Sequence, residues 1–274
     1  MRLPIKILVT IIGFALLTIL TQVGGIVFLL VIGIQVFVKT RVQSTGARYF
    51  AFAGVYIVLY SIVSILVVPP LAQKFGRVPL PMYGEVRPLN IVTCILNRHY
   101  VRPMLREAVL QSAETFRKQY PGAVVNYLDG CLPFYNGFPL MPHLSHNDGR
   151  KLDIAFFYMN VAGKPQSDAP SWIGYGVCER PRAGEENYPL RCRNKGYWQY
   201  GILEQIVPQG KKSQFIFDAQ RTAFLVNILS KQSSVQKIFI EPHLKMRLQL
   251  TSPKVRYHGC QAVRHDDHVH VQIY

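Results

Sequence analysis

Two histidine-rich patches contain the residues of this sequence that are best suited to chemistry. The first, at residues 142–153, contains His143, His146 and Asp153, and the second, at residues 265–271, reads His-Asp-Asp-His-Val-His-Val. Five of the eight histidines of the 274-residue chain lie in these two patches. Two imidazoles and one carboxylate form a ligand set for a catalytic zinc ion, whose fourth position stays open for water. If the patches converge in the fold, the sequence predicts such a zinc site.

The residues next to each patch predict how it is positioned. Residues 154–159 form an apolar run that indicates a buried strand, so Asp153 lies near the start of that strand and His146 on the loop before it. His268 and His270 are two residues apart, so both point to the same face of a strand. Either patch alone is more typical of an ordinary loop or of surface histidines, and the prediction therefore depends on finding the two together.

The periodicity of the remaining sequence predicts a domain of mixed helices and strands. Residues 160–216 are irregular and rich in Gly and Pro, which indicates a long insertion over the core. Asp218 is a predicted helix cap, and Pro121 with Gly122 ends the preceding long helix. The expected strands are 89–96, 123–128, 237–240 and 268–273, and the expected helices are 100–120, 218–231 and 242–250.

Two long apolar runs, at residues 3–38 and 49–71, predict an N-terminal membrane anchor. Each exceeds the roughly 20 residues that cross a bilayer, and no small-residue cleavage site follows a short apolar core. The first run is long for one span, and residues 21–25 can break it into a tight hairpin or lie within one long tilted helix. We therefore expect an anchor of two or three spans at 1–72, a Pro-rich linker at 73–84 and a folded domain at 85–274.

The charge distribution constrains partners and orientation. Lys and Arg outnumber Asp and Glu by 31 to 15, which suits an anionic partner such as lipid headgroups or an acidic polymer. The basic residues lack the interleaved aromatic residues of a nucleic-acid module, which argues against nucleic acid. The basic loop 39–48 and the residues Arg2 and Lys6 both favour the cytoplasm, and both preferences are met only if the first apolar run forms a hairpin.

The five cysteines contain no Cys-x-x-Cys pair, which argues against a Cys-rich zinc finger. Cys178 and Cys192 flank a polar loop. In an oxidising compartment a disulfide between them can close that loop, and in a reducing one they are ordinary thiols. Their spacing leaves both alternatives open.

The two patches also carry a resemblance to a known family. His143-x-x-His146-x-x-Gly149-x-x-x-Asp153 and the patch that begins at His265 resemble the penicillin-insensitive murein endopeptidases, within the wider group of lysostaphin-type, D-Ala-D-Ala-type and hedgehog-type zinc domains. The close match covers residues 142–154 and 264–272, and residues 218–250 are similar more loosely. The members of this family are typically exported and soluble, so the apolar runs depart from it.

The resemblance implies a role for each site residue. It implies zinc held by His146, Asp153 and His270, with His268 as the base and with His143 and His265 lining the site. The chemistry agrees, because a histidine two residues from a ligand on the same strand face can move a proton beside a zinc-bound water. Asp266 and Asp267 are either acceptors that orient imidazole N–H groups or surface turn residues.

These features together lead to an expected fold and function. We expect an α+β chain in which N-terminal transmembrane helices precede a zinc-peptidase domain with a central, mainly antiparallel sheet flanked by helices. The expected activity is hydrolysis of D-amino-acid-containing peptide cross-links in peptidoglycan, with the chain in the cytoplasmic membrane and its domain on the periplasmic side. The alternatives are a D,D-carboxypeptidase and a zinc-holding cell-wall binding module without catalysis. The sequence identifies no protein partner.

Overall fold

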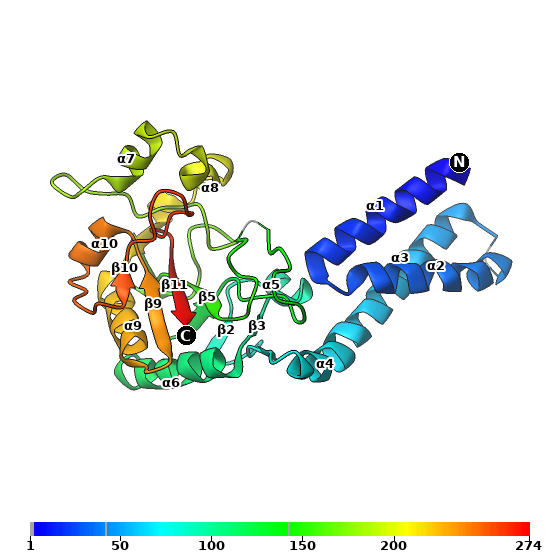
Figure 1. Ribbon diagram of the computed structural model, residues 1–274, viewed down its shortest axis with the longest axis horizontal. Coiled ribbons are helices and arrows are strands. Elements are labelled where there is room, and N and C mark those ends of the chain that lie inside the picture. Colours follow the sequence, from blue (N-terminus) through cyan, green and yellow to red (C-terminus); the bar gives the residue numbers. More distant parts are fainter. Residues whose placement is uncertain (1–2, 42, 142) are drawn as a thin grey trace.

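The chain has a helical N-terminal part and a mixed part of helices and strands (Figure 1). This computed structural model describes residues 3–41, 43–141 and 143–274. Arg2, Val42 and Pro142, which the sequence predictions use, lie outside the described residues. The helical part consists of α1 (Leu3–Thr21), α2 (Gly24–Arg41), α3 (Thr45–Ile62), a π-helical stretch (Val63–Val67) and α4 (Val68–Lys74).

Two helical segments of this part are long and apolar enough to cross a membrane. They are Leu3–Thr21 and the continuous segment Thr45–Lys74, while α2 contributes a shorter apolar stretch, Gly24–Gln35. In the apolar windows of the two long segments, 0% and 6% of the residues are buried. Apolar side chains on the outside of a helix are stable in lipid and unfavourable in water. The helical part is therefore suited to a membrane.

The first apolar run contains two helices and not one long helix. The chain turns at Gln22, whose φ of 64° lies in the left-handed region, and the Gly24 N–H donates to Thr21 Oγ1 at 2.8 Å. Gly25 allows the two helices to approach closely, because a Cβ there would lie 2.5 Å from the Phe14 carbonyl oxygen. As a result, the N-terminal ends of α1 and α3 both lie far from the domain (Figure 1).

A six-stranded sheet forms the centre of the domain, in the order β10-β9-β11-β5-β4-β2. The central strand β11 is antiparallel to both β5 and β9, and β5 is antiparallel to β4, whereas the outer pairs β2–β4 and β9–β10 are parallel. The sheet is thus antiparallel at its centre, and the mixed α+β class expected from the sequence is confirmed. The strands are β2 (Val86–Pro88), β4 (Val125–Tyr127), β5 (Lys151–Ala155), β9 (Val235–Phe239), β10 (Val255–Arg256) and β11 (His268–Ile273).

Two helices, α6 (Pro103–Gln119) and α9 (Ala219–Lys231), pack against each other and share the main hydrophobic core with the sheet. Both helices were predicted, including the Asp218 cap, whose carboxylate accepts from the Arg221 N–H. Phe116 of α6 stacks on Phe157 with ring centroids 4.7 Å apart, and both are almost fully buried. This core holds β5 and β11 in place.

The strand predicted at 89–96 is wrong. Strand β2 ends at Pro88, and α5 (Val92–Ile95) occupies the predicted range. The cause is Asn90, whose side-chain oxygen accepts from the Val92 N–H at 2.9 Å and so starts a turn. Asn97 ends this stretch with a φ of 56°. Local side-chain hydrogen bonding thus overrides the apolar character of the segment.

Part of the segment expected as a linker is packed into the domain. β1 (Val78–Pro79) pairs with β3 (Tyr100–Val101), and Arg77 and Leu80 are buried. Arg77 Nη1 donates to the Leu132 carbonyl at 2.7 Å. The chain therefore passes from α4 into the folded domain within a few residues.

The insertion at 160–216 contains short elements and is held by a disulfide. The bond joins Cys192 to Cys260, so a Cys178–Cys192 disulfide is wrong, and Cys178 is a buried free thiol. The Cys192–Cys260 bond joins residues that are 68 positions apart, much further than Cys178 and Cys192, the pair that the sequence suggested. The remaining elements are β6 (Tyr158–Asn160), β7 (Pro165–Gln166), α7 (Tyr188–Asn194), α8 (Ile202–Ile206), β8 (Phe215–Phe217) and α10 (Pro242–Arg247).

Candidate metal centre

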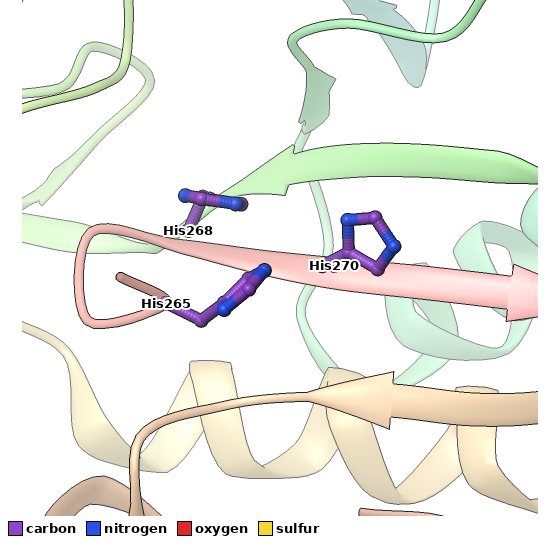
Figure 2. Close-up of side chains that lie close together, drawn as sticks. All are labelled: His265, His268 and His270. Atoms are coloured by element: carbon purple, nitrogen blue, oxygen red, sulfur yellow. The ribbon is translucent and has the colours of Figure 1, made fainter. Parts of the chain in front are cut away.

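The pairing of β11 with β5 brings the two patches together. His270 is the cross-strand partner of Asp153, and the His270 Nδ1 lies 2.8 Å from Asp153 Oδ1. Directly opposite residues of an antiparallel pair project to the same face. His268 lies two residues before His270 on β11, and His265 lies on the loop that leads into the strand (Figure 2). The two patches are therefore neighbours in space although more than 100 residues separate His270 from Asp153.

His146 enters the same group from the loop between β4 and β5. Its Nδ1–H donates to the Gly130 carbonyl at 2.9 Å, which leaves the Nε2 lone pair facing the strands. That Nε2 lies 3.2 Å from His270 Nδ1 and 3.3 Å from Asp153 Oδ1. Two imidazole nitrogens and one carboxylate oxygen thus form a compact triangle of donor atoms.

The triangle fits a small tetrahedral metal ion. Its three sides measure 2.8, 3.2 and 3.3 Å. Ligand atoms about 2.0–2.1 Å from a tetrahedral zinc ion lie about 3.3 Å from one another. Two imidazole lone pairs and a carboxylate oxygen that face one another repel unless a proton or a cation lies between them, and a metal ion meets this requirement. His146, Asp153 and His270 are the residues that would hold it.

A second group of possible ligands shares one of these residues. The donor atoms of His265, His268 and His270 lie within 4.8 Å of one another, and Figure 2 shows their rings together. Their ring centroids lie 5.1 Å apart for His265 and His268 and 5.3 Å apart for His265 and His270. In the first triangle, by comparison, all three distances between donor atoms are 2.8 to 3.3 Å. The group containing Asp153 is therefore the better match, and it supplies the negative charge that a dication requires.

Electrostatics in the centre favours a cation beside Asp153. Burial would raise the pKa of Asp153, but the neighbouring His146 and His268 lower it well below its ordinary value. Burial would lower the pKa of His146, but the Asp153 carboxylate reverses this and raises it. The pKa of His270 falls to about 4, mainly because of burial. An ionised carboxylate and a neutral imidazole are the protonation states that bind metal, so a metal ion and a proton on His146 compete for the same position beside Asp153.

Tyr175 and Asp129 complete the surroundings, and neither was identified from the sequence. The Tyr175 hydroxyl donates to Asp153 Oδ2 at 2.8 Å, which leaves Oδ1 for the donor triangle. Burial raises the pKa of Tyr175 well above its ordinary value, so it keeps this proton. Asp129 Oδ2 accepts from Arg98 Nη2 at 2.8 Å and from His143 Nδ1 at 3.2 Å. Asp129 directly precedes Gly130 in the sequence, and nothing in its spacing links it to the patches.

His268 and His143 lie beside the triangle and have free ring nitrogens. His268 Nδ1–H donates to Asp267 Oδ1 at 2.5 Å, and its Nε2 lies 3.5 Å from Asp153 Oδ1. The buried Nε2 atoms of His268 and His143 have no hydrogen-bond partner in the described part of the chain. Burial opposes charge on His268, but Asp153 and Asp267 raise its pKa to about 9. These two imidazoles are thus in reach of the centre without being part of the donor triangle.

The acidic residues of the second patch have different surroundings. Asp267 contacts His268 and also accepts from the Gly176 N–H at 2.6 Å. Asp266 instead accepts from the Arg264 guanidinium. Of the two, Asp267 is the one that orients a site imidazole.

The centre is closed on the side of the insertion. The six predicted site residues are 4% exposed or less. Residues of the insertion bond to the second patch, since the Glu179 N–H donates to the Asp266 carbonyl at 2.6 Å. The space beside His268 and Asp267 measures only about 10 Å³, which is about the least that holds one water. On this side, the described conformation therefore leaves the centre little open space.

The structure brings all six predicted site residues into one buried cluster on β5, β11 and the loops before them. His146, Asp153 and His270 form the donor triangle, and His143, His265 and His268 surround it. The described residues thus contain a group that can hold a metal ion. No family model matches the chain, and no curated protein matches it.

Proposed function

We propose that this chain is a membrane-anchored zinc peptidase that hydrolyses D-amino-acid-containing peptide cross-links in peptidoglycan. The observation that carries the proposal is the donor triangle of His146, Asp153 and His270 beside the free nitrogens of His268 and His143. A site that only stabilises the fold needs the ligands and not the two additional imidazoles. The resemblance of both patches to the murein endopeptidases supports the choice of substrate.

Each residue has a distinct task in this proposal. Zinc held by His146, Asp153 and His270 would supply a water of lowered pKa and a positive charge beside the scissile carbonyl. Tyr175 holds Asp153 by its Oδ2, so that Oδ1 keeps its place in the triangle. His268 takes a proton from the attacking water at Nε2 and returns it to the leaving amine, while Asp267 fixes the ring orientation through Nδ1. The negative charge of Asp153 raises the pKa of His268. A cation bound beside Asp153 offsets that charge, so His268 can lose its proton and act as a base.

The closed centre favours a second candidate function. With the site residues buried and only about 10 Å³ of space beside His268, the described conformation leaves little room for a peptide on this side of the centre. A zinc-holding module that binds the cell wall without cutting it needs no such room. A D,D-carboxypeptidase is the third alternative, and it shares the chemistry of the endopeptidase.

Digestion of purified muropeptides tests the activity. We expect the full-length protein, purified in detergent with zinc, to convert cross-linked muropeptides into uncross-linked ones, as read by mass spectrometry. Loss of a terminal D-alanine with the cross-links intact would identify a carboxypeptidase instead. Zinc-loaded protein that leaves every muropeptide unchanged would favour the binding module.

Localisation provides an independent test. Peptidoglycan lies outside the cytoplasmic membrane, so the proposal requires the domain on the outer side and the starts of α1 and α3 on the inner side. The Cys192–Cys260 disulfide agrees with an oxidising compartment. We expect a reporter fused after Tyr274 to be active only if it is of a kind that works outside the cytoplasm. Activity of a cytoplasmic reporter at the same position would exclude the peptidoglycan substrate.

A further inference from the structure

A cavity of about 560 Å³ lies where the membrane helices meet the domain. Its walls include Leu17 of α1, Ile57 of α3, Ile65 of the π-helical stretch and the domain residues Leu80 and Leu96. We call it the junction cavity. Its volume lies within the roughly 300–1,000 Å³ typical of ligand pockets. It shares no lining residue with the two groups that can hold a metal ion.

The junction cavity is continuous with the lipid-facing surface of the helices. Ile57 and Ile65 line it and are also 61% and 65% exposed. Both belong to the segment Thr45–Lys74, which is one of the two candidate spans. In a bilayer, the hydrocarbon that covers this helix therefore reaches the mouth of the cavity. Water filling an apolar space of this size is unfavourable, so a hydrocarbon chain is the occupant that the walls favour.

The domain side of the cavity includes three polar residues whose hydrogen bonding is incomplete. Asn97, His99 and Tyr100 line it and are 0%, 6% and 0% exposed. Asn97 Oδ1, His99 Nδ1 and the Tyr100 hydroxyl each lack a hydrogen-bond partner among the residues that the structure describes. Buried polar atoms without partners cost free energy, and three of them along one wall indicate that a polar group of a ligand belongs there.

Asn97 is fixed in place by the membrane helices. Its Nδ2 donates to the Tyr60 hydroxyl at 3.2 Å, to Ser64 Oγ at 3.4 Å and to the Thr21 carbonyl at 3.4 Å. Because these bonds use the N–H groups, the side chain presents its oxygen as an unpaired acceptor. Its left-handed backbone, with a φ of 56°, is a conformation that Asn tolerates, and it ends α5 at this position.

The polar group that fits this wall is uncharged. The described lining contains no Lys, Arg, Asp or Glu. Burial lowers the pKa of His99 to about 4, so its imidazole is neutral at physiological pH. A phosphate would have no cation to pair with here, whereas an ester carbonyl can accept from the Tyr100 hydroxyl, and a water beside the ester can donate to Asn97.

We propose that the junction cavity binds one acyl chain of a bilayer phospholipid, with the ester end of that chain among Asn97, His99 and Tyr100. This site does not depend on the peptidase activity. It does adjoin the metal centre, because the Gly130 N–H donates to the Arg98 carbonyl at 2.8 Å, and the Gly130 carbonyl accepts from His146. A bound chain therefore steadies the same segment that positions a metal ligand.

Photo-crosslinking with a defined lipid tests this site. The full-length protein is placed in phosphatidylcholine vesicles that contain a small fraction of the same lipid with a diazirine in its acyl chain, and labelled peptides are mapped by mass spectrometry. We expect labels on residues 94–100 of the domain as well as on the membrane helices. Ser61 lines the cavity, so Ser61→Trp fills it and should reduce labelling of 94–100 by at least about tenfold, because the chain loses its buried apolar contacts.

Ile62→Trp is the matched control. Ile62 is the next residue of the same helix, is 46% exposed and is not part of the cavity wall, so this variant should label like the wild type. Ser61→Leu is a smaller filling for the case in which the tryptophan prevents folding, with zinc content as the measure of an intact domain. Equal labelling of 94–100 in the Ser61 and Ile62 variants, or labels confined to the outer faces of α1 and α3, would overturn the proposal.

Discussion

His146→Ala and His270→Ala are each expected to abolish zinc binding. The purified wild-type protein should contain about one zinc per chain, as a three-ligand site with one open position implies. Removing either histidine leaves only two donors, Asp153 and one imidazole, which are too few to hold the ion. Removing a residue that only hydrogen-bonds to a metal ligand typically weakens metal binding about 10- to 100-fold. Removing a ligand itself should therefore lower the zinc affinity by more than about 100-fold. Zinc content is measured by elemental analysis, and affinity by competition with a chelator.

Two further histidine variants make this test specific. His265→Ala should retain zinc, because His265 belongs only to the second group of possible ligands. If His265→Ala loses zinc and His146→Ala keeps it, the ion is held by His265, His268 and His270, and our assignment is wrong. His258→Ala is the matched control, since its ring stacks on Phe239 at 4.1 Å and belongs to neither group.

His268→Ala is expected to separate catalysis from metal binding. The His268 side chain touches Asp267 and faces Asp153, but it is not part of the donor triangle, so the variant should keep its zinc and its fold. Without a group to move the proton, hydrolysis should slow by at least about 100-fold, the lower end of typical general acid–base contributions. Turnover of cross-linked muropeptides and zinc content are read on the same samples.

The pattern across the variants distinguishes the functions. His146→Ala should lose activity together with zinc, whereas His268→Ala should lose activity with zinc still bound. If His268→Ala turns over muropeptides at the wild-type rate, His268 has no part in the mechanism. Asp267→Asn should have an activity between those of the wild type and His268→Ala, because it keeps a hydrogen-bond acceptor beside His268 and removes the negative charge.

The six site residues could be predicted because the signal is local within each patch. His268 and His270 share a strand face by the alternation of any strand. The strand expected at 154–159, with Asp153 near its start, is shifted: β5 covers Lys151–Ala155, so Asp153 lies in its middle. That the patches meet depends on the pairing of β11 with β5, and no feature of either strand alone specifies this register. Tyr175 was missed for a related reason. It lies in the irregular insertion, so only the folded chain shows that its hydroxyl reaches Asp153.

The errors elsewhere have equally specific causes. The apolar residues at 89–96 predict a strand, but the hydrogen bond of Asn90 to the following backbone favours a turn and helix. The disulfide partner of Cys192 is Cys260, which is close in space and 68 residues away in sequence. Spacing identifies nearby cysteines and has no information on distant ones.

The short connection between α4 and the domain has a consequence for where the centre can work. Arg77 is bonded inside the domain, the Tyr60 hydroxyl donates to the Ile95 carbonyl at 2.6 Å, and the Phe134 N–H donates to Gln22 at 2.9 Å. A domain on a long flexible linker can reach a wide range of heights above the membrane. A domain that is hydrogen-bonded to its membrane helices stays within a narrow range of heights. With α1 and α3 in a bilayer, the donor triangle stays at a fixed height above the membrane, so the proposed peptidase would act only on material that lies directly on the membrane.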